Sequence, residues 1–165
     1  MAPLKNVVDQ TVIPVLLREA IKEELNRQIK RVVDANKAAA AAAKEQAIVD
    51  VKKLTEDTKS AGGKYFVATL SDGTDANALR EAATHAFAEG IACTLLSNVN
   101  GKEFIYVSVP PAVGIDVKGW LGAVCGPLGG KGGGGKNGVA QGQGPNVDAV
   151  PDAVAAAEAF AKLAI

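Results

Sequence analysis

The first third of the chain carries apolar residues at helical spacing. No Gly or Pro occurs from Val15 to Ala61, and strong helix formers fill residues 36–47 between two apolar stretches. This pattern predicts a helical arm, either one long helix or a hairpin that turns near residues 34–36. Because a narrow arm cannot bury its own apolar stripe, we expect the stripe to meet the rest of the chain, another helix or a second copy. The candidate self-association residues are Leu17, Ile21, Leu25, Ile29 and Val32.

Beyond residue 61 the pattern changes to short apolar runs rich in β-branched and aromatic residues. Residues 64–70, 91–97 and 102–109 are typical of buried strands. The last two are separated by the turn sequence 98–101, which predicts that they form a β-hairpin.

Three helices are expected among these strands. Residues 76–90 form the first, with Thr74 or Asp75 as its N-cap and Gly90 as its end. Residues 117–125 form a short second helix, in which Trp120 is expected to lie in the core. A third, apolar on one face, starts at Pro151 and runs to Ile165.

The element order β-α-β-β-α-glycine loop-α predicts an α/β fold. The expected organisation is a helical arm over residues 1–61 and a globular domain over residues 62–165, with a glycine-rich loop at 126–145.

Charge and composition argue against a disordered chain and against a strongly basic nucleic-acid-binding protein. The chain is 48% hydrophobic, which argues against wholesale disorder, and its 18 basic residues balance 18 acidic ones. Residues 62–165 hold seven Lys and Arg against nine Asp and Glu. Any surface that attracts nucleic acid must therefore be local.

The reactive side chains are few. Cys93 and Cys125 form no CxxC pair, which is typical of structural thiols in a reducing compartment. A single histidine, His85, leaves little material for a metal site or a His-activated nucleophile, and we expect it to be structural. No catalytic residue, metal or cofactor is therefore predicted. No apolar run approaches the ~18 residues of a membrane span, so a soluble, intracellular protein with no membrane partner is expected.

The segment Gly126–Pro145 is half glycine, with only Lys131 and Lys136 charged. Residues 130–136 match the phosphate-loop pattern G-x-x-x-x-G-K of NTPases, but Asn137 stands where Ser or Thr would bind Mg²⁺. No buried strand is expected before the motif and no helix after it. Nucleotide hydrolysis is therefore disfavoured.

Two interpretations of this segment remain open. One is a passive linker, although linkers are usually polar throughout and lead to another domain. The other is a contact surface lined by backbone N–H groups, which bind anions readily. Gln141 and Gln143 add donors and acceptors, and no acidic residue occurs from Gly126 to Val147. This combination suits a sugar-phosphate backbone or the exposed edge of a base pair.

The order of motifs resembles a known family. A glycine run at 129–135, the step Ala140-Gln141-Gly142 and an Ala-rich last helix at 151–165 are similar to the C-terminal domain of alanyl-tRNA synthetase, a module also found on DHH-type phosphoesterases. The upstream helical segment resembles that of cytosolic eukaryotic enzymes. Lys131 interrupts the glycine run, a departure from the family pattern.

The resemblance implies a non-catalytic domain that binds the outer corner of tRNA(Ala) and works with the aminoacylation and editing domains of the same enzyme. It also implies a cytoplasmic location, with a share in mitochondria left open. The chain lacks the editing zinc motif and any ATP-site motif, so it should not charge or edit tRNA by itself. The expected RNA-binding residues are Gly129, Gly130, Lys131, Gly132, Gly133, Gly134, Gly135, Lys136, Gln141 and Gln143. The alternative is a module for dimerisation, or for protein or DNA interaction, that uses the helical arm.

Overall fold

The computed structural model describes residues 15–164, and their side chains from Leu17 onward. The predicted N-terminal part of the arm, residues 1–14, and the last residue of the predicted terminal helix, Ile165, lie outside this range. The chain divides into two compact units, the first ending at Ala39 and the second beginning at Ala40.

The arm is one continuous helix, α2 (Val15–Ser60), so the hairpin alternative was wrong. Its run of alanines and charged residues contains no helix breaker, which explains why the helix does not turn near residue 34. In the first unit Leu17 and Val32 are 51% and 45% exposed, and Ile21 is 38% exposed. Leu25 and Ile29 are half-buried.

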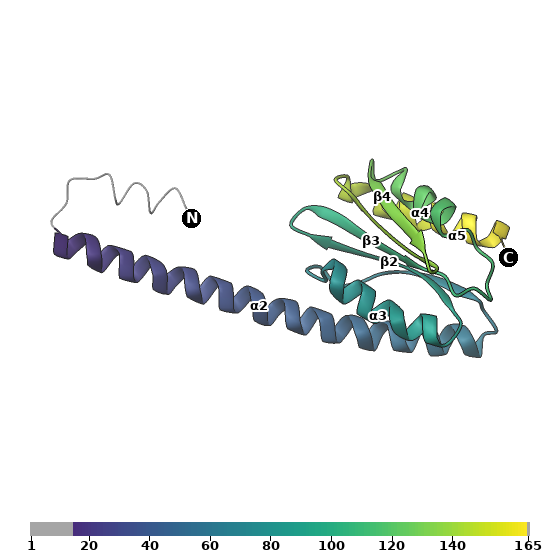
Figure 1. Ribbon diagram of the computed structural model, residues 1–165, viewed down its shortest axis with the longest axis horizontal. Helices are drawn as coiled ribbons and strands as arrows, with labels where there is room; N and C mark the ends of the chain where they lie inside the picture. Colours follow the sequence, from purple (N-terminus) through teal and green to yellow (C-terminus); the bar gives the residue numbers. More distant parts are fainter. Residues whose placement is uncertain (1–14, 165) are drawn as a thin grey trace. The chain divides into compact units, whose positions relative to one another are not determined.

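The second unit is built on one mixed sheet (Figure 1). Its five strands lie in the order β1-β2-β3-β5-β4, and β1 is parallel to β2 while the other pairs are antiparallel. The predicted hairpin of the second and third strands is confirmed, and so is the α/β fold class. The strand bounds are β1 (Tyr65–Thr69), β2 (Ala92–Val99), β3 (Lys102–Ser108), β4 (Lys131–Lys136) and β5 (Val139–Gly144).

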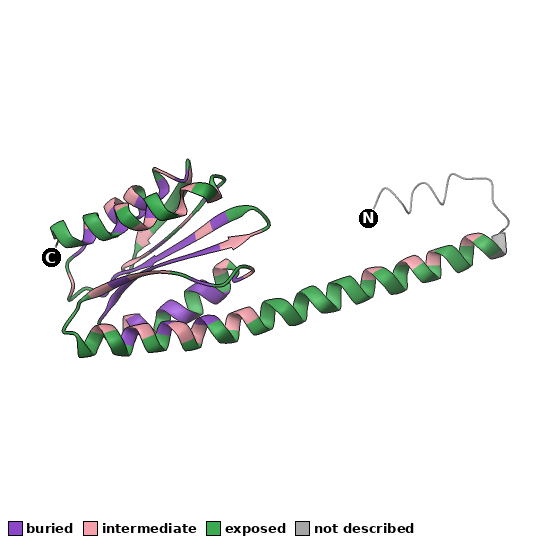
Figure 2. Cartoon of the chain, turned by 180° about the vertical axis from the view of Figure 1, so that it is seen from behind, coloured by how far each residue is buried: buried purple, intermediate pink, exposed green. Residues whose placement is uncertain are grey.

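Helices cover both faces of this sheet. The second half of α2 and helix α3 (Ala76–Ala88) bury one face, in a cluster that includes Val51 and Leu79. Helices α4 (Val117–Cys125) and α5 (Val150–Ala164) bury the other face. A short 3₁₀ turn, η1 (Val147–Ala149), leads into α5. Figure 2 shows the buried residues concentrated in the sheet and on the helix sides that face it.

Local signals explain most of these elements. The Asp75 carboxylate accepts a hydrogen bond from the Ala78 N–H at 2.8 Å and so caps α3, as predicted. Trp120 is fully buried, and its indole N–H donates to the Ala157 carbonyl oxygen at 2.9 Å. Its predicted place in the core is therefore confirmed.

The glycine segment is not a loop. Residues 131–136 and 139–144 are strands of a β-hairpin, and β5 pairs in turn with β3. Asn137 and Gly138 form the two-residue turn, with φ angles of 56° and 75°. Positive φ at both central positions is what a type I′ hairpin turn requires, and Asn-Gly is its preferred sequence. That dipeptide was the missed signal.

Candidate nucleic-acid interface

The hairpin forms one edge of the sheet. Strand β4 pairs with β5 on one side, and no other strand of the described chain pairs with its second side. The pairing is regular from Lys131 to Gly134 and is interrupted by a bulge before Lys136. Lysines at both ends and a bulge are features that keep exposed edges from pairing with other chains. The backbone N–H and C=O groups on the outer side of the regular part have no partner strand within the described chain.

Most glycines of the hairpin are required by packing within the protein. A Cβ on Gly132 would lie 2.5 Å from Leu121 Cδ2, and one on Gly142 would lie 2.8 Å from Cys125 Sγ. A Cβ on Gly130 would lie 2.5 Å from the Gln143 carbonyl oxygen. Because these positions carry no side chains, the hairpin can pack closely against α4, and the backbone at Gly130 can lie close to that of Gln143.

Three other glycines have no such explanation. A Cβ on Gly122 or Gly133 would meet nothing within 4 Å, and one on Gly126 would make only ordinary contacts from 3.6 Å outward. None has a positive φ. Gly122 lies exposed within α4, where glycine costs about 1 kcal/mol relative to alanine. Neither packing within the fold nor backbone conformation therefore requires glycine at these three positions.

All three glycines line the same hollow, which lies between α4 and β4. Its volume is about 600 Å³, and Gly130, Gly132 and Gly134 complete much of its wall. Cys125 lies at the floor, where burial raises the pKa of its thiol and keeps it protonated. Because six of its ten lining residues are glycines, we call this hollow the glycine surface.

A third lysine belongs to this region. Lys118 lines the glycine surface, and a Cβ on Gly135 would lie 2.8 Å from its Cε atom, so its aliphatic stem lies over that glycine. Sequence reasoning missed this residue because it lies on the preceding helix. The nearby Asp116 carboxylate accepts hydrogen bonds from the backbone N–H groups of Lys118 and Gly119 and so caps α4. No acidic residue lines the hollow itself.

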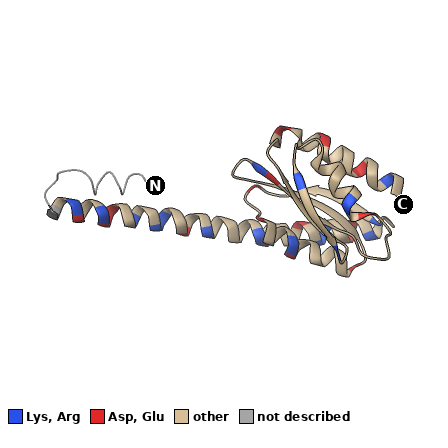
Figure 3. Cartoon of the chain, turned by 45° about the horizontal axis from the view of Figure 1, so that its top comes forward, with Lys and Arg blue, Asp and Glu red and all other residues tan. Residues whose placement is uncertain are grey.

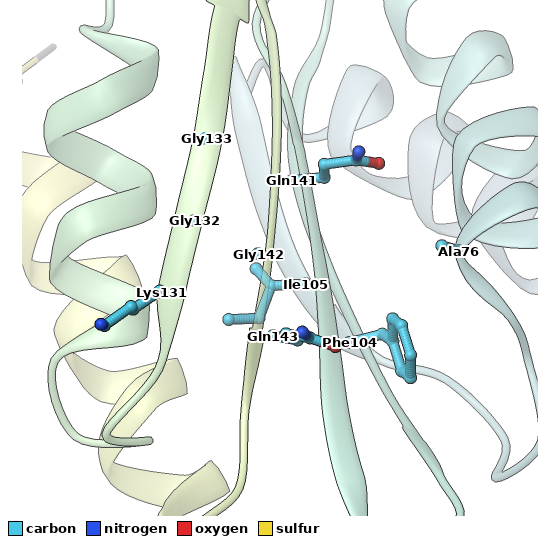
Figure 4. A pocket seen from close by; sticks show the side chains of 9 residues that line it. All are labelled: Ala76, Phe104, Ile105, Lys131, Gly132, Gly133, Gln141, Gly142 and Gln143. Carbon is cyan, nitrogen blue, oxygen red and sulfur yellow. The ribbon is translucent and has the colours of Figure 1, made fainter.

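The predicted RNA-binding residues are not all on one side. Figure 4 shows Gln141 and Phe104 pointing to the side of the strand pair away from α4, and Lys131 lines the same cavity as these two residues. Lys136 and Gln141 line a separate hollow beside α3, and Gln143 lines its continuation. The structure thus divides the predicted set between the two faces of the hairpin.

Basic and acidic residues alternate along α2 rather than gathering by sign (Figure 3). Burial raises the pKa of Cys93 to about 12, which removes it as a nucleophile. Within residues 15–164 no three His, Cys, Asp or Glu residues come together in a way that could hold a metal ion. None of the described helices combines the length and the apolar character needed to cross a bilayer.

Comparison with known proteins agrees with this architecture. Residues 62–163 match the family model of the DHHA1 domain. The C-Ala domain of alanyl-tRNA synthetase from Aquifex aeolicus has a similar fold, with a TM-score of 0.52 and 20% sequence identity. The match covers 61% of this chain and 89% of that domain.

A second solved structure is more distant. RecJ from Thermus thermophilus, in complex with Mg²⁺, matches with a TM-score of 0.44 and 18% identity. This match covers 91% of the present chain but only 21% of RecJ. No curated protein sequence matches the chain.

Proposed function

The chain belongs to the DHHA1 domain family, and from this premise we propose that it is a non-catalytic tRNA-binding domain of the alanyl-tRNA synthetase type. Its likeness to the C-Ala domain of a tRNA synthetase supports this choice of ligand. The observation that carries the proposal is the glycine surface. Gly122, Gly126 and Gly133 lack side chains without any need within the fold, and all three line one hollow.

The ligand is the folded outer corner of a tRNA. A surface without Cβ atoms lets a large, flat partner approach the backbone closely, and free N–H groups can donate to phosphate oxygens. Lys118 lines this surface and supplies positive charge. Within the glycine run, Gly129 and Gly130 precede β4, and residues 132–135 make up most of that strand. Recognition is therefore by shape and phosphate contact rather than by reading bases.

Weak binding by the isolated chain is expected. Two or three lysine–phosphate contacts give a salt slope of only about −1.5 to −3. The aminoacylation and editing domains of a parent enzyme would then supply the rest of the affinity, and this domain would help to bring both onto one tRNA. This role requires no metal, cofactor or reaction in the chain itself, and we expect it to be performed in the cytoplasm.

The proposed tRNA-binding surface is tested by placing a large side chain in its hollow. Gly122→Leu adds a side chain to open space on α4, so the fold should remain intact while tRNA binding weakens by roughly tenfold or more. Ala155→Leu is the matched control, because Ala155 is exposed on α5. Fluorescence anisotropy with labelled tRNA(Ala) measures both. Equal affinity of Gly122→Leu and wild type would refute the proposed surface.

A second candidate function is self-association through α2. It is favoured by the exposure of Leu17, Ile21 and Val32, which follow one another at helical spacing with Leu25 and Ile29. Apolar positions at this spacing are typical of helix–helix contacts. Sedimentation equilibrium of the chain tests it, with Leu25→Glu expected to yield monomer. A wild-type chain that stays monomeric at high concentration excludes this function.

A further inference from the structure

Strand β4 has one side that no other strand of the described chain covers. It is the last strand in the order β1-β2-β3-β5-β4, and its inner side pairs with β5 (Figure 1). Residues 131–134 and Lys136 are exposed. Alternate residues of a strand direct their N–H and C=O groups to opposite sides, so about half of these groups in β4 point away from β5. The edge therefore offers backbone donors and acceptors to a further strand.

The two lysines of β4 lie on the same face of the sheet, although they are five positions apart in the sequence. Lys131 pairs with Gln143 and Lys136 with Val139, and these β5 residues are four positions apart. The bulge before Lys136 accounts for the extra residue. Residues at even spacing on a strand share one face, and four positions span about 13 Å. Both lysines accordingly line cavities with Gln141 on the side that faces α3.

The opposite face of β4 borders the glycine surface. The hollow there, of about 600 Å³, has apolar walls at Leu121, Cys125 and Ala140, and Lys118 is its one charged lining residue. A Cβ on Gly122 would meet nothing within 4 Å, so this part of α4 leaves space open. Side chains of neighbouring strands on one face point the same way. Every second side chain of a strand added beside β4 would therefore point toward this hollow.

The charges around β4 favour one kind of partner strand. No acidic residue lines the cavities on either side of β4, and none of Lys118, Lys131 and Lys136 has an ion-pair partner within the described chain. The β4 edge of a second copy would bring its own lysines against these, and like charges on paired strands are destabilising. Carboxylates on the partner strand would instead form favourable cross-strand pairs.

We propose that β4 binds an extended acidic segment of a partner protein, which joins the sheet as a sixth strand. In this mode of recognition main-chain hydrogen bonds give affinity, and pockets for alternate side chains give specificity. Lys131 and Lys136 favour two carboxylates four positions apart, and the glycine surface favours apolar side chains on the opposite face between them. The expected pattern is acidic–apolar–any–apolar–acidic. This interaction goes beyond the proposed tRNA role and does not depend on it.

The first experiment measures fluorescence anisotropy of a labelled peptide, Thr-Glu-Val-Thr-Val-Glu-Thr, titrated with the full chain. A peptide of the same composition with its two Glu adjacent is the comparison, and it should bind at least about fivefold more weakly. Equal affinity of the two peptides would overturn the proposal. So would the absence of binding at up to about 1 mM chain.

Charge reversal tests the lysines. Lys131→Glu/Lys136→Glu should weaken binding of the acidic peptide by about tenfold or more, and should bind a peptide with Lys in place of both Glu. This gain of binding shows that the variant is folded. Lys64→Glu/Lys162→Glu is the matched control, because both residues are exposed outside β4 and the change in net charge is the same. An equal loss in the control would mean that net charge alone attracts the peptide, which contradicts the proposal.

A chemical change in the peptide tests the backbone pairing. Two peptides are N-methylated at alternate positions, so that one loses the N–H groups that face β4 and the other loses those that face away. One of them should lose binding and the other should remain within about twofold of the unmethylated peptide. Equal behaviour of the two would show that the peptide binds by charge without forming a strand.

Amide hydrogen exchange locates the added strand. The peptide should slow exchange at residues 131–134 and leave β1, the other edge of the sheet, unchanged. Slowing at β4 that appears without peptide as the chain is concentrated would identify a second copy as the occupant and overturn the proposal. The two proposals fail separately. Absence of peptide binding with tRNA bound removes only the added strand, and absence of tRNA binding with peptide bound removes only the proposed function.

Discussion

Gly142 on β5 and Cys125 on α4 lie so close that a Cβ on the glycine would be 2.8 Å from the cysteine Sγ. The same added atom would be 3.2 Å from Leu121 Cδ1. The absence of a side chain at residue 142 thus sets how near α4 can pack to the hairpin. Gly133, on the neighbouring strand, has open space where its side chain would be.

This difference predicts opposite outcomes for two equal substitutions. Gly142→Ala should lower the free energy of unfolding by about 1–3 kcal/mol, because an extra methyl group forces the helix and strand apart. Gly133→Ala should change it by less than about 0.5 kcal/mol. Urea denaturation followed by circular dichroism measures both. A tolerated Gly142→Ala would show that α4 can shift without cost.

Gly122 predicts a rare gain in stability. Replacing it by alanine should raise the free energy of unfolding by about 0.5–1 kcal/mol, because the site is exposed, helical and open. The melting temperature should then rise by roughly 2–5 °C in calorimetry. A fall in stability would mean that Gly122 has a structural role that its surroundings do not reveal.

The hairpin lysines predict a change in salt dependence. The double variant Lys131→Ala/Lys136→Ala should weaken tRNA binding and reduce the slope of log affinity against log salt by about 0.7–0.9 for each phosphate that is no longer neutralised. Thermal stability should hardly change, since both residues are exposed.

The control for this variant is its aggregation state. Both lysines also lie on the edge strand β4, where charged side chains hinder pairing with other chains. Their removal could therefore promote association through this edge. Light scattering must therefore show that the double variant remains dispersed before its affinity is compared. An unchanged affinity and salt slope in a dispersed sample would exclude these lysines from the RNA contact.

Glu103 predicts a pH dependence of stability. Its side chain is 1% exposed, its Oε1 atom has no hydrogen-bond partner, and burial together with the Asp72 charge raises the pKa of its carboxyl. For an acid whose pKa is higher in the folded state, stability is fully present below the unfolded pKa and is lost as pH rises through the folded pKa. The contribution of Glu103 should therefore decline as pH increases above about 4.5.

Glu103→Gln isolates this effect, since it keeps the shape of the side chain and removes its ionisation. Urea denaturation between about pH 4 and pH 8 should show a smaller loss of stability with rising pH in the variant than in wild type. Glu158→Gln is the control, because Glu158 is exposed on α5. Identical pH profiles for wild type and Glu103→Gln would show that this carboxyl titrates normally.

Sequence alone determined the elements whose signals are local. The helical character of the arm follows from a stretch without Gly or Pro, although the sequence left a hairpin open, and Asp75 and Gly90 mark the two ends of α3. The strands β1, β2 and β3 follow from short β-branched runs, and Trp120 lies in the core as its apolar neighbours predicted. In each case the residues carry side chains whose spacing reports the backbone conformation.

Only the tertiary structure decided what the glycine segment does. Glycine has no side chain and therefore no periodicity, so strands β4 and β5 are specified by pairing with β3 and by packing on α4. The same assembly places Arg80 and Lys136 around one cavity, and the side-chain stem of Lys118 over Gly135. A sequence pattern cannot show such neighbours, because they depend on which strand lies beside which helix.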